Sequence, residues 1–199
     1  MSRIVLAMSV SLDGFFEGPD GDLSWHLVDD ELHRHFNDEL RGMSAFLDGR
    51  VSYELMAAFW PTADDDPAST GPVREFAGIW REMPKVVYSR TLRSAGWNTR
   101  IVREVVPADV RAMADAAEGD LAVGGAVLAD TFRRYGLIDE YRLYVHPVVL
   151  GRGRPLFPPA DRPEPLRLLA TRTFGNGVVL LRYASDPAGG GAAEVSSSS

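Results

Sequence analysis

Two adjacent glycines, Gly124 and Gly125, join a short apolar run to a segment with helical spacing. The run from Leu121 to Val123 predicts a buried strand, and apolar residues recur after the glycines at intervals of three and four. Glycine permits a tight turn, and its missing Cβ lets another molecule approach the backbone. The first amides of a helix have no carbonyl partner within it and can donate to a phosphate. The pattern predicts either a phosphate site or a plain structural turn.

The turn does not match the G-x-G-x-x-G pattern of Rossmann dinucleotide folds, because positions 128 and 130 are Leu128 and Asp130. A doubly wound dehydrogenase is therefore not implied. The same order of strand, glycine and helix start recurs at Ala45 to Phe59, where Gly49 precedes an arginine, Arg50, and a hydroxyl, Ser52. Both side-chain types bind phosphate.

A third group of phosphate-binding side chains, Ser89-Arg90-Thr91, follows the strand predicted from Lys85 to Ser89. In open α/β sheets, ligands gather beyond the carboxyl ends of the strands. This position therefore supports one shared anion site at that edge. The alternative for Arg90 is a solvated turn residue, or a partner of an acid such as Glu104.

Acidic and imidazole side chains cluster around the first predicted helix, Asp29 to Met43. Asp29 and Asp30 fall in its first turn, where carboxylates favour the helix dipole, so capping competes with a catalytic role. Among the histidines, His33 and His35 lie on different helix faces. No metal site is expected.

The remaining pattern alternates strands and helices and then changes to strands alone. Before residue 139 we also expect strands at 3–11 and 100–105, and helices from Pro72 to about Pro84 and at 107–118. An irregular glycine-rich loop is expected at 12–22. Strands follow at 140–150, 166–174 and 178–183, the last two joined by Asn176-Gly177, a strong hairpin signal. Pro147 predicts a bulge or an edge. Residues 1–185 form one predicted domain, and the Gly, Ala and Ser content of 186–199 predicts a disordered tail.

Composition narrows the functional class. The 199 residues include no cysteine, which excludes thiolate nucleophiles and cysteine-bound zinc, and the net charge of -7 argues against nonspecific nucleic-acid binding. No apolar run has the length of a membrane span, and no signal-peptide pattern begins the chain, so a cytoplasmic location is expected.

The sequence at successive strand ends resembles the dihydrofolate-reductase fold. The resemblance is to the branch formed by the reductase domain of the bifunctional riboflavin-biosynthesis deaminase-reductase and its stand-alone relatives. The stretches that carry it span residues 3–184 and include Leu12-Asp-Gly14, Gly21-Asp-Leu-Ser-Trp25, Leu47-Asp-Gly-Arg-Val-Ser-Tyr-Glu54, Val87-Tyr-Ser-Arg90, Val123-Gly-Gly-Ala126, His146-Pro-Val-Val-Leu-Gly151 and Gly153-Arg-Pro-Leu-Phe157.

The resemblance implies a three-layer α/β/α fold with a mostly parallel eight-stranded sheet, a C-terminal antiparallel hairpin, and NADPH as cofactor. Position by position, it implies that Gly49, Arg50 and Ser52, with Gly124, Gly125, Ala126 and Val127, hold the pyrophosphate region. It places Ser89 and Arg90 at the 2′-phosphate, and Ala7, Asp13 and Gly14 beside the nicotinamide. Ser52 stands where these families usually have threonine.

The substrate side departs from the folate enzymes. Asp29, Asp30 and Glu31 compete for the position of their single catalytic carboxylate, with Asp30 as our candidate, and Val145 replaces a supporting hydroxyl. Trp25, Phe59 and His146 are the expected substrate contacts.

The favoured hypothesis is an NADPH-dependent reductase, similar to dihydrofolate reductase or 5-amino-6-(5-phosphoribosylamino)uracil reductase, that passes hydride to a small heterocyclic, carbonyl or imine substrate. A pyrimidine-like or pterin-like substrate fits this class. The alternative is a dinucleotide-binding or assembly module that has lost catalysis. Relatives in this branch commonly pair through the region of Tyr141 to Val149, so we expect a homodimer, without nucleic-acid or membrane partners.

Overall fold

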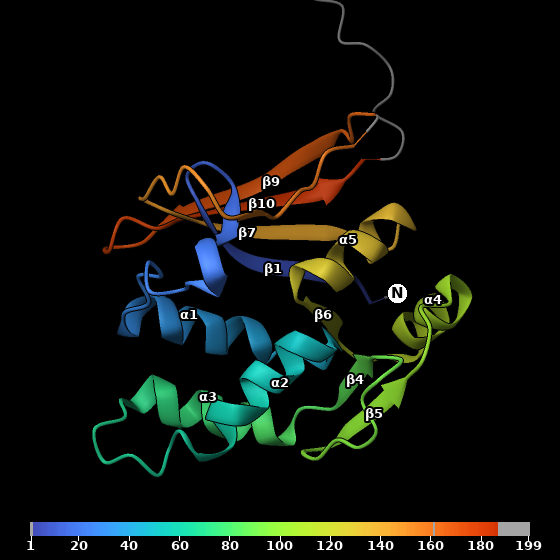
Figure 1. The fold of residues 1–199 in the computed structure, drawn as a ribbon, viewed down its shortest axis with the longest axis horizontal. Coiled ribbons are helices and arrows are strands. Elements are labelled where there is room, and N and C mark those ends of the chain that lie inside the picture. The colour runs from blue at the N-terminus through green and yellow to red at the C-terminus, as the bar shows by residue number, and fades with distance from the viewer. Residues whose placement is uncertain (1, 161, 187–199) are drawn as a thin grey trace, which may run out of the picture.

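The computed structural model describes residues 2–160 and 162–186 (Figure 1). The predicted tail lies almost entirely outside these residues. The helices are α1 (Asp30–Leu40), α2 (Arg50–Phe59), α3 (Gly71–Glu82), α4 (Pro107–Ala116) and α5 (Ala126–Arg134), with short 3-10 turns at Pro19–Gly21 and Trp60–Thr62. The strands are β1 (Ile4–Ser11), β2 (Phe15–Glu17), β3 (Met43–Gly49), β4 (Lys85–Tyr88), β5 (Thr99–Val102), β6 (Asp120–Gly124), β7 (Glu140–His146), β8 (Arg154–Pro155), β9 (Leu166–Thr173) and β10 (Val179–Ser185).

Eight strands form one sheet in the order β5-β4-β3-β6-β1-β7-β10-β9. All pairs from β5 to β7 are parallel, and β10 pairs antiparallel with both β7 and β9. The predicted mostly parallel sheet with a C-terminal hairpin is therefore confirmed. Gly177, with a φ of 87°, adopts the left-handed conformation in the hairpin turn that Asn-Gly predicted.

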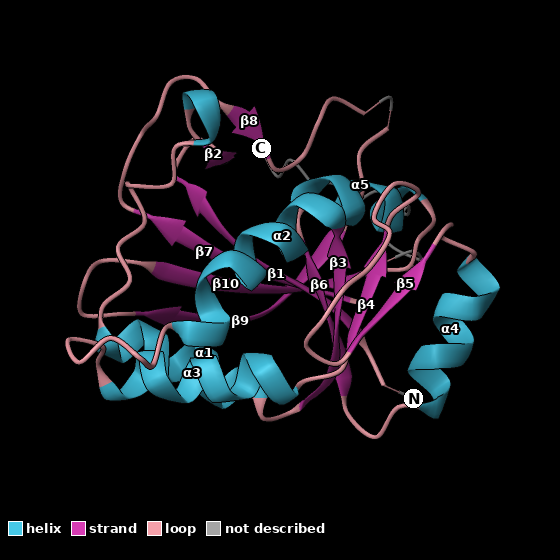
Figure 2. Cartoon of the chain, turned by 60° about the horizontal axis from the view of Figure 1, so that its bottom comes forward, coloured by secondary structure: helices cyan, strands magenta, loops and turns pink. Residues whose placement is uncertain are grey.

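Helices cover both faces of this sheet, as the predicted three-layer fold requires. One buried cluster joins Ile4 and Leu6 of β1 to Val110 of α4 and Phe132 of α5. On the opposite face, α1, α2 and α3 cover the sheet, and α1 and α3 lie side by side (Figure 2). None of the helices in the described ranges has the length and apolarity of a membrane span.

The loop after β1 contains a strand that its sequence does not reveal. Residues of β2 pair with β8 in a separate two-stranded antiparallel sheet, so the loop is tied to the segment after β7. The amide of Leu156 also donates to the Gly14 carbonyl at 3.0 Å. The loop at 12–22 is thus held against the carboxyl end of the sheet rather than extended into solvent.

Candidate active site

The two predicted glycine turns lie next to each other at the carboxyl ends of β3 and β6. Gly49 is the N-cap of α2 and Gly125 the N-cap of α5, and neither helix start has a side-chain cap. A Cβ on Gly125 would lie 2.1 Å from Oγ of Ser52, and a Cβ on Gly49 would lie 3.7 Å from that of Leu128. Two helix starts with uncapped amides therefore face one region, which suits a diphosphate.

Both glycines of the second turn are required by the geometry. Gly125 has a φ of 83°, where a side chain strains the backbone, and a Cβ on Gly124 would lie 2.1 Å from Oδ1 of Asp48. The fit to a dinucleotide phosphate group therefore comes from the uncapped first amides of α2 and α5, because the space beside Gly125 is filled by Oγ of Ser52. The polar group that occupies the space beside Gly124 is the carboxyl of Asp48.

Ala7, in the middle of the sheet, is an exposed position next to the two glycine turns. Ala7 lies on β1, between β6 and β7, yet it is exposed, although so apolar a strand is typical of one covered on both faces. Leu6 pairs with Val123, so Ala7 is level with Gly124 across the sheet. Side chains alternate along β1, and Leu6 belongs to the cluster with α4 and α5. Ala7 therefore faces the opposite side, between α1 and α2.

The turn after β4 holds the predicted 2′-phosphate residues. Oγ of Ser89 accepts hydrogen bonds from the amides of Thr91, at 3.2 Å, and Leu92, at 2.9 Å. Arg103 donates to the carbonyl of Ser89 at 2.9 Å, which fixes the turn further. Arg90 projects from this rigid turn as an exposed residue. The predicted phosphate ligand Arg50 pairs with Glu54 at 2.9 Å on the surface of α2.

Asp13 ties two loops together at the end of β1. Its carboxylate accepts from Oγ of Ser11 at 2.7 Å and from the amides of Gly151 at 2.7 Å and Leu150 at 3.1 Å. The Ser11 hydroxyl and these amides lower the pKa of Asp13 below its ordinary value. Gly14 next to it has a φ of 86°. Asp13 thus positions the loop that the family resemblance predicts beside a nicotinamide.

Trp25, His26 and His146 form an aromatic cluster before α1. The two imidazoles stack with centroids 5.3 Å apart, and Trp25 meets both rings edge-on. Nδ1 of His146 accepts from the amide of Leu27 at 3.1 Å, so its proton lies on Nε2, which is buried without a partner among the described residues. Burial, with His26 second, lowers the pKa of His146 to about 4. His146 is fully buried, so here it positions the segment that carries Trp25.

The three competing carboxylates have different surroundings. Asp29 is the N-cap of α1 and accepts from the amide of Leu32 at 2.9 Å. Glu31 accepts from the amide of Gly175 at 3.0 Å and so contacts the β9–β10 turn. Asp30 is half exposed and lies 3.8 Å from Arg34 on the same helix. Asp29 and Glu31 are thus engaged by backbone amides, whereas Asp30 has only this long ion pair within the described part of the chain.

An exposed apolar stripe lies on the side of α2 that carries Ser52. Leu55 and Phe59 follow Ser52 by three and seven residues, which places all three on neighbouring positions of one helix side. Leu55 is 61% exposed and Phe59 is 57% exposed. Ser52 lies against Gly125, and Ala7 is level with the neighbouring Gly124. This side of α2 therefore lies near the exposed sheet position at Ala7.

Comparisons with known proteins place this geometry in a family. The family model of the RibD C-terminal domain matches residues 2–180. The chain belongs to this family. It is 34% identical over 182 residues to the uncharacterized protein YyaP of Bacillus subtilis (strain 168), covering 91% of this chain and 94% of that protein.

Solved structures agree with the fold of this RibD C-terminal domain. A putative riboflavin biosynthesis protein from Shewanella sp. PV-4 has a TM-score of 0.69 at 19% identity, over 92% of this chain and 99% of that one. Dihydrofolate reductase from Enterococcus faecalis, solved with NADP(H), has a TM-score of 0.59 at 16% identity, over 92% and 96% of the two chains. The dihydrofolate-reductase-like fold predicted from the strand-end motifs is confirmed.

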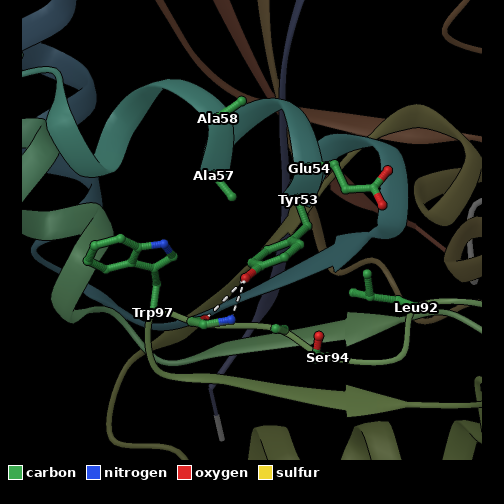
Figure 3. A pocket seen from close by; sticks show the side chains of 9 residues that line it. Tyr53, Glu54, Ala57, Ala58, Leu92, Ser94 and Trp97 are labelled. Atoms are coloured by element: carbon green, nitrogen blue, oxygen red, sulfur yellow. Dashed lines mark hydrogen bonds between the residues drawn. The ribbon is translucent and has the colours of Figure 1, made fainter.

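A separate pocket of about 570 Å³ opens on another side of α2 in this RibD C-terminal domain (Figure 3). Tyr53, Glu54 and Ala57 line it from the helix, opposite the loop from Leu92 to Trp97. The hydroxyl of Tyr53 donates to the carbonyl of Gly96 at 3.1 Å and accepts from its amide at 3.0 Å. None of the predicted site residues lines this pocket, and its charged side chain is a carboxylate, so it does not suit a phosphate.

Two residues of the site were missed from the sequence. Leu55 was not singled out because one exposed leucine on an amphipathic helix is ordinary. Asp48 carried a usable signal, since a carboxylate within the apolar strand Ala45 to Asp48 and directly before a glycine turn is unusual for a buried position.

Proposed function

We propose that this chain is an NADPH-dependent reductase that passes hydride to a small heterocyclic, carbonyl or imine substrate. The observation that carries the proposal is the pair of adjacent, uncapped helix starts at Gly49 and Gly125 beside an exposed position of the sheet, Ala7. NADPH, when bound, supplies the hydride. The amides that begin α2 and α5 would hold the diphosphate, with the side chains of Ser52 and Arg50 close by.

The chain's own residues then orient the acceptor and supply a proton. Leu55 and Phe59 present apolar surface along α2, and Trp25 lies before α1 on the segment held by His146. Asp30 is the proton donor in this proposal, acting directly or through water, because Asp29 and Glu31 already accept hydrogen bonds from backbone amides. A pyrimidine-like or pterin-like ring fits the mixture of apolar and acidic groups.

The test is the loss of NADPH absorbance with a panel of dihydropterin, aminopyrimidine, aldehyde and imine substrates. We expect turnover with at least one class, and a loss of at least tenfold in turnover for Asp30→Asn with unchanged NADPH affinity. Asp38→Asn, at an exposed carboxylate near the other end of α1, is the matched control. NADPH binding without turnover on any class would contradict the reductase proposal.

The second candidate is a dinucleotide-binding module without catalysis. One observation favours it: Asp29 caps α1, Glu31 contacts the hairpin turn, and Asp30 is half exposed, so no carboxylate of this group is buried in the way that usually tunes a catalytic acid. In this case NADPH binds and Asp30→Asn changes nothing measurable.

A further inference from the structure

Asp48 is a buried acid at the centre of the proposed cofactor site. It precedes Gly49, the N-cap of α2, and its partner across the sheet is Gly124, which precedes the N-cap of α5. Only 6% of Asp48 is exposed. Its Oδ1 occupies the space where a side chain on Gly124 would lie. The carboxyl therefore stands between two helix starts that have no caps of their own.

Within the described ranges, no group donates a hydrogen bond to the Asp48 carboxyl. The charge that acts on it is that of Lys85 on β4, whose ammonium group already donates to the carbonyls of Trp80, Met83 and Trp97. Burial raises the pKa of Asp48 to about 7, and the charge of Lys85 opposes this effect. A carboxylate that is only 6% exposed and accepts no hydrogen bond is costly to keep charged, so uptake of a proton is favourable there.

The charged groups on the other surrounding elements are already engaged. On α2, Arg50 pairs with Glu54. The facing position on β6 is a glycine, and the first turn of α5, Ala126 to Asp130, carries an acid only at its end, which pairs with Arg133 and Arg134. Arg142 on β7, level with Ala7, pairs with Glu39 and Glu140. Among the described cations, Lys85 is therefore the one that acts on the charge of Asp48.

We propose that Asp48 takes up one proton from solvent when a dinucleotide diphosphate binds between α2 and α5. A new O–H bond forms on the carboxylate, and water or buffer loses the proton. Asp48 therefore becomes neutral as the negatively charged diphosphate enters the site. Like charges at short range disfavour each other, which raises the pKa of Asp48 in the complex above its value in the free protein. Affinity for the cofactor then falls as pH rises between those two values.

The inference rests on the proposed cofactor, and calorimetry tests it with NADPH as the probe. Titrations at pH 8 in two buffers of different ionisation enthalpy give the number of protons taken up. We expect uptake approaching one proton for the wild type and less for Asp48→Asn. The dissociation constant of the wild type should rise between pH 7 and 9, by at most about tenfold per pH unit from this residue, and that of Asp48→Asn should rise less. Burial lowers the pKa of Lys85 to about 8, so its ammonium group titrates in the same range. The 2′-phosphate, with a second pKa of about 6, is already ionised throughout this range.

Asp38→Asn removes the same charge from an exposed position and should behave as the wild type. This control distinguishes an effect of the Asp48 carboxyl at the site from an effect of the net charge of the protein. If Asp48→Asn does not fold, the ¹³C shift of the Asp48 carboxyl in the wild type replaces it, and we expect its titration midpoint to rise on saturation with NADPH. Binding of NADPH without proton uptake, or with an unmoved midpoint, overturns the inference and leaves the proposed function standing. A folded protein that binds no NADPH between pH 6 and 9 overturns both.

Discussion

Arg90 is the residue that we expect to distinguish the two nicotinamide cofactors. It projects from a turn fixed by Ser89 and Arg103, and no ion pair of Arg90 occurs among the described residues, including one with Glu104. A charge-assisted hydrogen bond contributes about 1.5–3 kcal/mol, so Arg90→Ala should weaken NADPH binding roughly 10- to 100-fold. NADH binding should barely change. Dissociation constants of both cofactors decide this, and an equal effect on the two would move the 2′-phosphate to another residue, with Arg93 as the next candidate.

Gly125 is the residue whose substitution should separate ligand approach from backbone strain. Gly125→Ala places a Cβ against Oγ of Ser52 and in a left-handed conformation, whereas Gly136, at the other end of α5, has a φ of 62° with no atom near its missing Cβ. Gly136→Ala therefore carries only the strain, about 1–2 kcal/mol. We expect both variants to melt lower and Gly125→Ala alone to lose NADPH binding at a temperature where both are folded. Intact binding by folded Gly125→Ala would show that the turn is only structural.

At the scale of elements, the segment before α1 is held by its contacts with β7 and the hairpin. The amide of Leu27 donates to His146, and its carbonyl accepts from Nδ2 of Asn176 at 2.9 Å. His146 is thus the link between the end of β7 and the start of α1. The position of Trp25 and Asp30 relative to the sheet depends on a neutral imidazole.

This arrangement predicts a loss of stability in acid. Burial lowers the pKa of His146 to about 4, while an unfolded histidine titrates near 6.5. Between these values the unfolded chain binds a proton that the folded chain does not. The free energy of unfolding should therefore fall as pH drops below 6.5, by at most about 1.4 kcal/mol per pH unit from this residue. Urea unfolding from pH 7 to 4 measures the slope, which His146→Asn should make shallower. An unchanged slope would assign the effect to the other histidines.

Sequence patterns located most elements because local signals mark their ends. The helix α2 begins after Gly49 and ends at Phe59, as the sequence pattern predicted. In contrast, α1 ends at Leu40 rather than near Met43, because Met43 begins β3 and its apolar side chain fits either pattern. The strand β7 ends at His146, one residue before Pro147, rather than at residue 150.

Other features depend on contacts between distant segments and leave no local pattern. The strands β2 and β8 are too short for alternation to show, and their pairing fixes the loop at 12–22. The exposure of Ala7 arises because α1 and α2 leave the middle of β1 uncovered, which the apolar sequence of that strand hides. The two glycine turns were predictable because the backbone conformation and close contacts there require glycine. The juxtaposition of Asp48 with Gly124 was not, because it needs the register between β3 and β6.

At the scale of the whole molecule, the open edge of the sheet leads to a prediction about assembly. The expected pairing through the region of Tyr141 to Val149 stays a prediction. In the described chain β7 is hydrogen-bonded by β1 and β10 on its two sides, so it has no free edge for strand pairing with a second copy. The free edge on that side of the sheet is β9, whose eight residues are all exposed and include Leu166, Leu168 and Leu169. An exposed apolar edge strand favours association unless it is covered. We therefore predict a homodimer in which β9 of each copy contacts the other.

Sedimentation at micromolar concentration should give a species of twice 21.8 kDa for the wild type. Leu168→Glu places a charge in the predicted contact, at a side chain that is 52% exposed in the single chain, and should give a monomer. Its melting temperature should equal that of the wild type when both proteins are measured at a concentration low enough for the wild type to be monomeric. Val51→Glu, at a similarly exposed apolar side chain on α2, is the matched control and should remain dimeric, because α2 lies over β3 and β4, far along the sheet from β9. Loss of the dimer in both variants would indicate a general effect of charge, and a wild type that sediments only at 21.8 kDa would contradict the predicted assembly.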